Sequence, residues 1–220
     1  MTIPAVKWIT EQGLLVKVEF STPWGTCDVV GVELARTRVA ERIANGQRRP
    51  IGPPLRIALF RLIPDVRTGQ STTVVALSER VDAPISSVET DLQALVERRF
   101  VLQHPDGSLQ SLGCWAPLHT RIVAVELKLE RIDQAIAQAR SHTAFATESF
   151  IGLPQDKAAR LVCSGRVREV EQAGIGLLAV NSEGATVLIR PAAKVPSDPV
   201  LQMHCVERFW SQCVPRGRRA

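Results

Sequence analysis

The sequence has no tyrosine, and none of its five cysteines is spaced as a C-x-x-C pair. An odd set of cysteines without metal-ligand spacing is typical of reduced thiols, and we expect a cytoplasmic protein. His204 and Cys205, near Cys213, suggest zinc. Because tetrahedral zinc sites usually show closely paired ligands, we favour thiols that pack in a core.

Other absences exclude whole classes of protein. The start of the chain lacks a basic region followed by a long apolar run, so we expect no signal peptide. No apolar run approaches the length of a membrane span, so we expect no membrane partner. The chain has neither G-x-S-x-G nor G-x-x-x-x-G-K-[ST], which argues against a serine hydrolase of that type and against nucleotide hydrolysis.

The bulk composition fits a folded α/β protein. The 220 residues are 45% hydrophobic and 22% charged, enough for one large domain or two small ones with a sizeable core. The net charge is +5, which permits a polyanionic partner without proving one.

Two short apolar segments carry charges where buried strands are normally apolar. Asp28 lies in residues 27–32, and Glu126 and Lys128 lie in residues 122–129. Alternation along a strand places Glu126 and Lys128 on one face. Such charges are costly unless they pair or bind something. An ion pair on a solvated face is the alternative, although the apolar neighbours on that face argue against it.

The strand at 14–20 and the strand at 27–34 form a predicted hairpin around a loop at 21–26. This register places Phe20 opposite Cys27 and Glu19 opposite Asp28. Two carboxylates in that position repel one another unless a divalent cation lies between them. A slipped register, with Glu19 in solvent, is the alternative.

The middle of the chain differs in character from both ends. Residues 36–61 are rich in arginine and include a proline-rich linker. Hydrophobic spacing then predicts three helices and a hairpin with an Asp106-Gly107 turn, in the order 54–65, 71–81, 84–98 and 100–109. This layout, with the phrase DLQALVERRFV, resembles a winged helix-turn-helix.

The remaining pattern returns to strands and helices after the strand at 122–129. It predicts, in order, a helix at 131–146, a strand at 148–154, a helical region at 156–173, a hairpin over 174–190 and a helix at 199–213. We therefore expect a discontinuous core of residues 1–35 plus 121–220, interrupted by an inserted module of residues 36–120.

The order Glu19, Asp28, Glu126-x-Lys128, with the phrase VAVELKLERIDQAIAQARSH, resembles the PD-(D/E)xK nuclease superfamily. The resemblance implies a restriction-endonuclease-like mixed sheet flanked by helices, here with an inserted winged-helix (α+β) subdomain. It also implies a divalent-metal-dependent nuclease that hydrolyses phosphodiester bonds in DNA.

The resemblance implies a role for each matching residue. Asp28, Glu126 and the backbone carbonyl of Leu127 would bind Mg²⁺ or Mn²⁺, which prefer hard oxygen ligands. Lys128 would orient or deprotonate the attacking water, or stabilise the transition state. Glu19 would be an outer or additional metal ligand.

Two positions on the predicted helix at 131–146 are possible auxiliary residues. Gln138 matches a helix glutamine that several superfamily members place near the site. His142 stands where those members often carry a tyrosine, which leaves its role open.

The inserted module has two interpretations. As a DNA reader it would place the 84–98 helix in the major groove, while arginines at its end and in the preceding segment contact phosphates. The residues expected to contact DNA are Arg48, Arg49, Ser86, Ser87, Thr90, Arg98 and Arg99. Acidic residues on the same helix argue equally for a protein partner or a homodimer.

Two rival functions stand beside the nuclease. One is a non-catalytic DNA-binding or regulatory protein built on the same fold. The other is a scaffold that holds a protein partner through the winged helix and shows no salt-sensitive affinity for nucleic acid.

Overall fold

The computed structural model describes residues 1–213 except 24, 114–115 and 193. It divides into two compact units. The first unit combines Met1–Leu34 with His119–Gln202, and the second combines Ala35–Leu118 with the chain from Met203 onward. The expected boundaries of the inserted module, at 35/36 and 120/121, lie within two residues of these divisions. The segment from Met203 onward had been expected in the discontinuous core and instead belongs to the second unit.

The first unit is built on a mixed sheet of six strands. Their spatial order is β1-β2-β5-β6-β7-β8. The pairs β5/β6 and β6/β7 are parallel, and the other three neighbouring pairs are antiparallel. The strands are β1 (Leu15–Thr22), β2 (Gly25–Leu34), β5 (His119–Leu127), β6 (Glu148–Pro154), β7 (Gly176–Val180) and β8 (Ala185–Ile189). The predicted α/β class, a mixed sheet flanked by helices, is confirmed.

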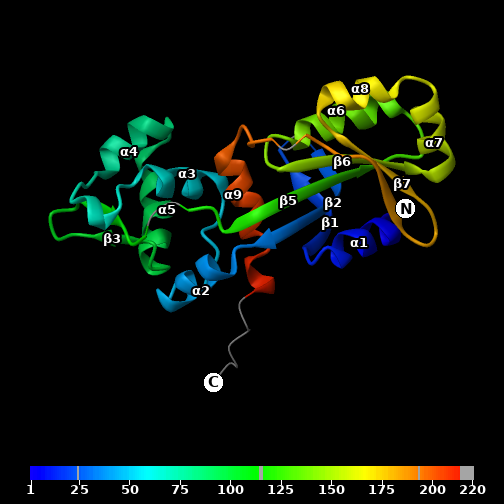
Figure 1. The fold of residues 1–220 in the computed structure, drawn as a ribbon. Helices are drawn as coiled ribbons and strands as arrows, with labels where there is room; N and C mark the ends of the chain where they lie inside the picture. The colour runs from blue at the N-terminus through cyan, green and yellow to red at the C-terminus, as the bar shows by residue number, and fades with distance from the viewer. Residues whose placement is uncertain (24, 114–115, 193, 214–220) are drawn as a thin grey trace. The chain divides into compact units, whose positions relative to one another are not determined.

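Helices cover both faces of this sheet (Figure 1). On one face α1 (Thr2–Glu11) packs Ala5 and Ile9 against apolar residues of β2, β5 and β6. The sequence had not predicted this helix. The opposite face is covered by α6 (Ile132–His142), α7 (Gln155–Cys163) and α8 (Val167–Ala173).

Strand β5, which carries Glu126, is buried on both faces. Ile122, Val123, Ala124 and Val125 are wholly buried, as expected for a strand with helices on both sides. Val125 packs with the α1 core, so the next residue, Glu126, belongs to the opposite face. The Glu126 carboxylate therefore lies on a buried face of the sheet, at a position where the neighbouring residues of β5 are apolar.

The β1–β2 hairpin has the predicted register but a shorter loop. Phe20 pairs with Cys27, and pairing continues to Thr22 and Gly25, so most of the expected 21–26 loop is strand. Glu19 is opposite Asp28 in this register, yet the two do not pair. Glu19 adopts a left-handed φ of 49° and is exposed. The ladder is therefore interrupted at the position where two carboxylates were expected to face each other.

The second unit contains the predicted three helices followed by a hairpin. Helices α3, α4 and α5 precede the two-stranded β3–β4 sheet, which is the order of a winged helix-turn-helix. The elements are α2 (Arg36–Ala44), α3 (Pro54–Leu62), the 3₁₀ turn η1 (Val66–Thr68), α4 (Val74–Val81), α5 (Ile85–Glu97), β3 (Val101–Gln103) and β4 (Leu109–Ser111). From Met203 onward, α9 (Pro199–Glu207) and η2 (Trp210–Gln212) also belong to this unit.

The arginine-rich segment is not simply a linker, as the sequence had suggested. Its first part forms α2, and Arg42 on that helix is buried. The guanidinium forms a two-armed ion pair with Glu207 and lies 3.9 Å from the ring centre of Trp210. Contacts with Glu207 and Trp210, which are distant in sequence, thus bury one face of α2, and the composition of the helix does not predict this burial.

Within the described part of the chain, none of the helices combines the length and the apolar character needed to cross a membrane.

Candidate functional site

Glu126 and Lys128 form the centre of the candidate site. Only 1% of the Glu126 surface is exposed, and its Oε1 atom lies 2.7 Å from Nζ of Lys128. Lys128 lies just beyond the end of β5, and its backbone N–H donates to the carbonyl of Gly152, which extends the pairing with β6. The burial of Glu126 rules out the alternative of an ion pair on a solvated face.

Asp28 joins this pair through the backbone of β5. The ladder between β2 and β5 runs to Val29 and Val125 and is not continued to Asp28 and Glu126. Instead, the backbone N–H of Leu127 donates to Oδ2 of Asp28 over 2.7 Å. The carboxylate thus takes the place of a backbone acceptor, and the half-buried Asp28 is held beside the end of β5.

The electrostatics of Glu126 reflect this crowding. Burial raises the pKa of the Glu126 carboxyl above its usual range, the hydrogen bond and charge of Lys128 lower it, and the negative charge of Asp28 raises it further. One oxygen of the carboxylate, Oε2, is buried and has no hydrogen-bond partner among the described residues. An unpartnered buried carboxylate oxygen is costly and requires an explanation.

Helix α6 brings His142 to this unpartnered oxygen. The Nε2 atom of His142 lies 4.0 Å from Oε2 of Glu126, and the side chain is 5% exposed. Burial, with a smaller effect of the Lys128 charge, lowers the pKa of His142 to about 4. The imidazole is therefore neutral near pH 7, and its Nδ1 atom is also buried without a described partner.

Gln138 lies one helical turn before His142, so the two side chains share a face of α6. The Oε1 atom of Gln138 is buried and has no described hydrogen-bond partner. Both auxiliary positions suggested by the sequence thus carry unpartnered polar atoms.

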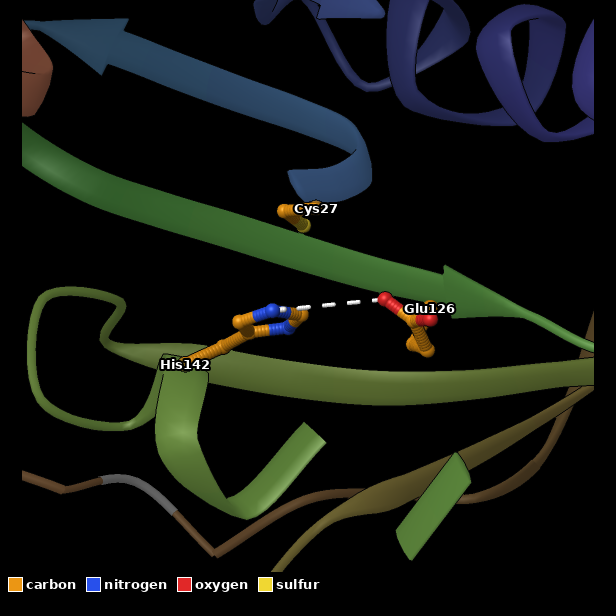
Figure 2. A group of neighbouring side chains, drawn as sticks. All are labelled: Cys27, Glu126 and His142. Atoms are coloured by element: carbon orange, nitrogen blue, oxygen red, sulfur yellow. Dashed lines mark ion pairs between the residues drawn. The ribbon is translucent and has the colours of Figure 1, made fainter. Parts of the chain in front are cut away.

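Cys27 is a member of the site that sequence reasoning missed. One donor atom from each of the Cys27 thiol, the Glu126 carboxylate and the His142 imidazole lies within 4.8 Å of the others. Figure 2 shows the imidazole and the carboxylate directed toward each other near Cys27. Burial, and to a smaller extent the charge of Glu126, raises the pKa of the Cys27 thiol well above its usual value. The sequence had assigned the cysteine thiols to the core, and the ladder between β2 and β5 does not reach Cys27.

Glu19 is not brought into this group. It is exposed, and no cluster of three candidate metal ligands that includes it is found in the described residues. Its left-handed backbone breaks the pairing that would have placed its carboxylate opposite Asp28. Leu127, whose carbonyl was expected to be a ligand, is half-buried and bonds to Asp28 through its N–H.

The residues expected to contact DNA belong to the second unit. Most of them are exposed: Arg48, Arg49, Ser86, Ser87, Thr90 and Arg99. Arg98 is half-buried, and its guanidinium donates to the carbonyls of Pro50 and Ile51. Arg98 therefore fixes the segment before α3.

The second unit also contains a cavity of about 460 Å³. Its lining includes Arg42 and Glu207, whose charges already neutralise each other.

Comparison with known proteins gives little guidance to function. No protein-family model matches the sequence, and no curated protein matches it. Among solved structures, the SPO1766 protein of unknown function from Silicibacter pomeroyi is similar over 96% of this chain and 83% of its own. The sequence identity is 13% and the TM-score is 0.43.

Proposed function

We propose that this protein is a divalent-metal-dependent phosphodiesterase that cleaves DNA, with its active site at Asp28, Glu126 and Lys128. The observation that carries the proposal is the Oε2 atom of Glu126, a carboxylate oxygen buried within the sheet layer without a described hydrogen-bond partner. Lys128 occupies the other oxygen, and Asp28 lies beside the end of the same strand.

A hard divalent cation fits these donors. Burial and the neighbouring Asp28 both raise the pKa of Glu126, which means that the site disfavours a second negative charge. Asp28 and Glu126 would hold Mg²⁺ or Mn²⁺ through carboxylate oxygens. When bound, such an ion lowers the pKa of a coordinated water and neutralises charge on a phosphate.

The protein's own groups would supply the remaining chemistry. Lys128, on a side chain that is 26% exposed, can donate to a non-bridging phosphate oxygen and offset the charge that develops there. The bond from Leu127 fixes the carboxylate of Asp28, so this group does not need to be ordered when substrate binds.

The inserted winged helix supports a DNA substrate. The exposed side chains of Ser86, Ser87 and Thr90 lie on α5, the second helix of the helix-turn-helix. The net charge of +5 favours association with a polyanion.

The test is cleavage of supercoiled, linear, single-stranded and branched DNA in Mg²⁺ and Mn²⁺. Glu126→Gln keeps the shape of the side chain and removes its charge, and Lys128→Ala removes the ammonium. Glu33→Gln is the matched control, because Glu33 is an exposed acid on the same strand as Asp28. We expect cleavage by the wild type and by Glu33→Gln, and none by Glu126→Gln or Lys128→Ala.

Cleavage that survives Glu126→Gln would contradict the proposal. If the folded protein cleaves none of these substrates but binds duplex DNA equally well with and without divalent metal, the non-catalytic DNA-binding function gains support instead.

A further inference from the structure

We propose that Cys27, Glu126 and His142 form a binding site for a thiophilic divalent ion, Zn²⁺ in the first instance, which shares the Glu126 carboxylate with the hard-metal site of the proposed phosphodiesterase. The proposal does not require DNA cleavage. It assigns a bound cation to Oε2 of Glu126, the carboxylate oxygen that does not pair with Lys128.

Cys27, Glu126 and His142 converge on one point in the first unit. The three side chains come from β2, β5 and α6, and all three are buried. One donor atom of each lies within 4.8 Å of the other two, and Figure 2 shows His142 and Glu126 directed toward each other near Cys27. Thiolate, carboxylate and imidazole are the three kinds of ligand that Zn²⁺ takes from proteins.

Two of these side chains carry polar atoms without described partners. Oε2 of Glu126 and Nδ1 of His142 are both buried and lack hydrogen-bond partners among the described residues. The two side chains are 1% and 5% exposed, so bulk water does not satisfy these atoms. A cation bound between Oε2 of Glu126 and Nε2 of His142, which lie 4.0 Å apart, would satisfy the carboxylate oxygen.

The two carboxylate oxygens of Glu126 have different neighbours. Its Oε1 atom pairs with Lys128, whereas Oε2 faces His142. Oε2 can therefore bind a cation beside Cys27 while Oε1 keeps its ion pair with Lys128. A sulfur ligand is a poor partner for Mg²⁺ and a good one for Zn²⁺ or Co²⁺, so the two sites differ in metal preference.

A fully apolar role for Cys27 is the competing explanation. Its Sγ atom lies 3.5 Å from the carbonyl oxygen of Val29 and 3.6 Å from that of Val125, within reach of a weak thiol hydrogen bond. Metal binding requires the thiol to lose its proton, so coordination and core packing give different spectroscopic results.

The experiment is titration of the chelator-treated full-length protein with Co²⁺, followed by Zn²⁺. Thiolate coordination gives a sulfur-to-cobalt charge-transfer band in the near ultraviolet, which Zn²⁺ should abolish by displacement. We expect the band in the wild type and in Cys163→Ser, because Cys163 is an exposed cysteine outside the cluster. We expect no band in Cys27→Ser, and an affinity for Zn²⁺ at least about tenfold weaker in His142→Gln, the loss that even an outer partner of a metal ligand causes.

Asp28→Asn separates this proposal from the proposed function. It should abolish cleavage and leave the cobalt band in place. If Cys27→Ser does not fold, X-ray absorption at the zinc edge of the wild type decides the question, because the proposal requires a sulfur scatterer. A cobalt band that persists in folded Cys27→Ser, or a bound zinc ion with only nitrogen and oxygen scatterers, would overturn the proposal.

Discussion

Oδ2 of Asp28 accepts a hydrogen bond from the backbone N–H of Leu127, 99 residues later in the chain, at the point where the pairing of β2 with β5 ends. This contact anchors an acidic side chain beside the buried Glu126. It also satisfies a backbone donor that the strand partner leaves unpaired.

Asp28→Asn tests the contact directly. The amide oxygen of Asn can still accept from Leu127, so the free energy of unfolding should change by no more than about 1 kcal/mol. Cleavage should fall by about 100-fold or more, because a metal-binding charge is lost. Urea unfolding and a plasmid-nicking assay measure the two quantities, and a variant that keeps full activity would remove Asp28 from the site.

Lys128→Met leaves the buried carboxylate of Glu126 without its partner. We expect a loss of about 1–3 kcal/mol in the free energy of unfolding at pH 7, less than for a fully buried pair because Lys128 retains some exposure. The double variant Lys128→Met with Glu126→Gln should recover most of this loss, since no uncompensated charge remains. Equal destabilisation in the single and double variants would show that the ion pair is not what stabilises this edge.

His142 predicts a pH dependence of stability in the metal-free protein. Burial lowers its pKa to about 4 in the folded chain, against about 6.5 when unfolded. Between these values the unfolded chain binds a proton that the folded chain does not, so the free energy of unfolding falls as the pH decreases from 6.5 to 4. The full effect is about 3 kcal/mol and is constant below pH 4.

The comparison is with His142→Gln after chelator treatment, by urea unfolding at a series of pH values. The wild type should lose more stability than the variant as the pH falls through this window. Parallel curves for the two proteins would contradict the assignment of a buried neutral imidazole.

Arg42→Met should destabilise the second unit by about 3–5 kcal/mol, because Glu207 would keep a buried charge without its partner. Glu207 also accepts from the backbone N–H of Ile51, so it cannot turn out to solvent without losing a second bond. Arg36→Ala, at an exposed position on the same helix, should change the free energy of unfolding by less than about 0.5 kcal/mol. Similar losses in both variants would show that the buried pair contributes nothing specific.

The sequence predicted the elements that depend on local periodicity. The hairpin register, with Phe20 opposite Cys27, followed from strand alternation and turn residues. Helix α5 is within one residue of its expected range at each end because its apolar positions repeat with helical spacing. Helix α2 was missed because Arg42, which anchors it, is buried through a partner 165 residues away.

The candidate site was predictable only where the strand pattern is regular. Glu126 was found because a carboxylate in a buried strand breaks an otherwise apolar pattern. Cys27 was missed because the pairing of β2 with β5 does not reach it, and an apolar-looking thiol in an apolar strand gives no signal. The exposure of Glu19 depends on a left-handed backbone at a residue other than glycine, which nothing in the local sequence indicates.

The proposed hydrolytic site at Glu126 is tested by the rate of nicking of supercoiled DNA in Mn²⁺ by the wild type and by Glu126→Gln, with both proteins verified as folded. We expect metal-dependent nicking by the wild type that Glu126→Gln reduces by about 100-fold or more. Equal rates for the two proteins, or a wild-type rate that does not depend on added metal, would contradict a hydrolytic site at Glu126.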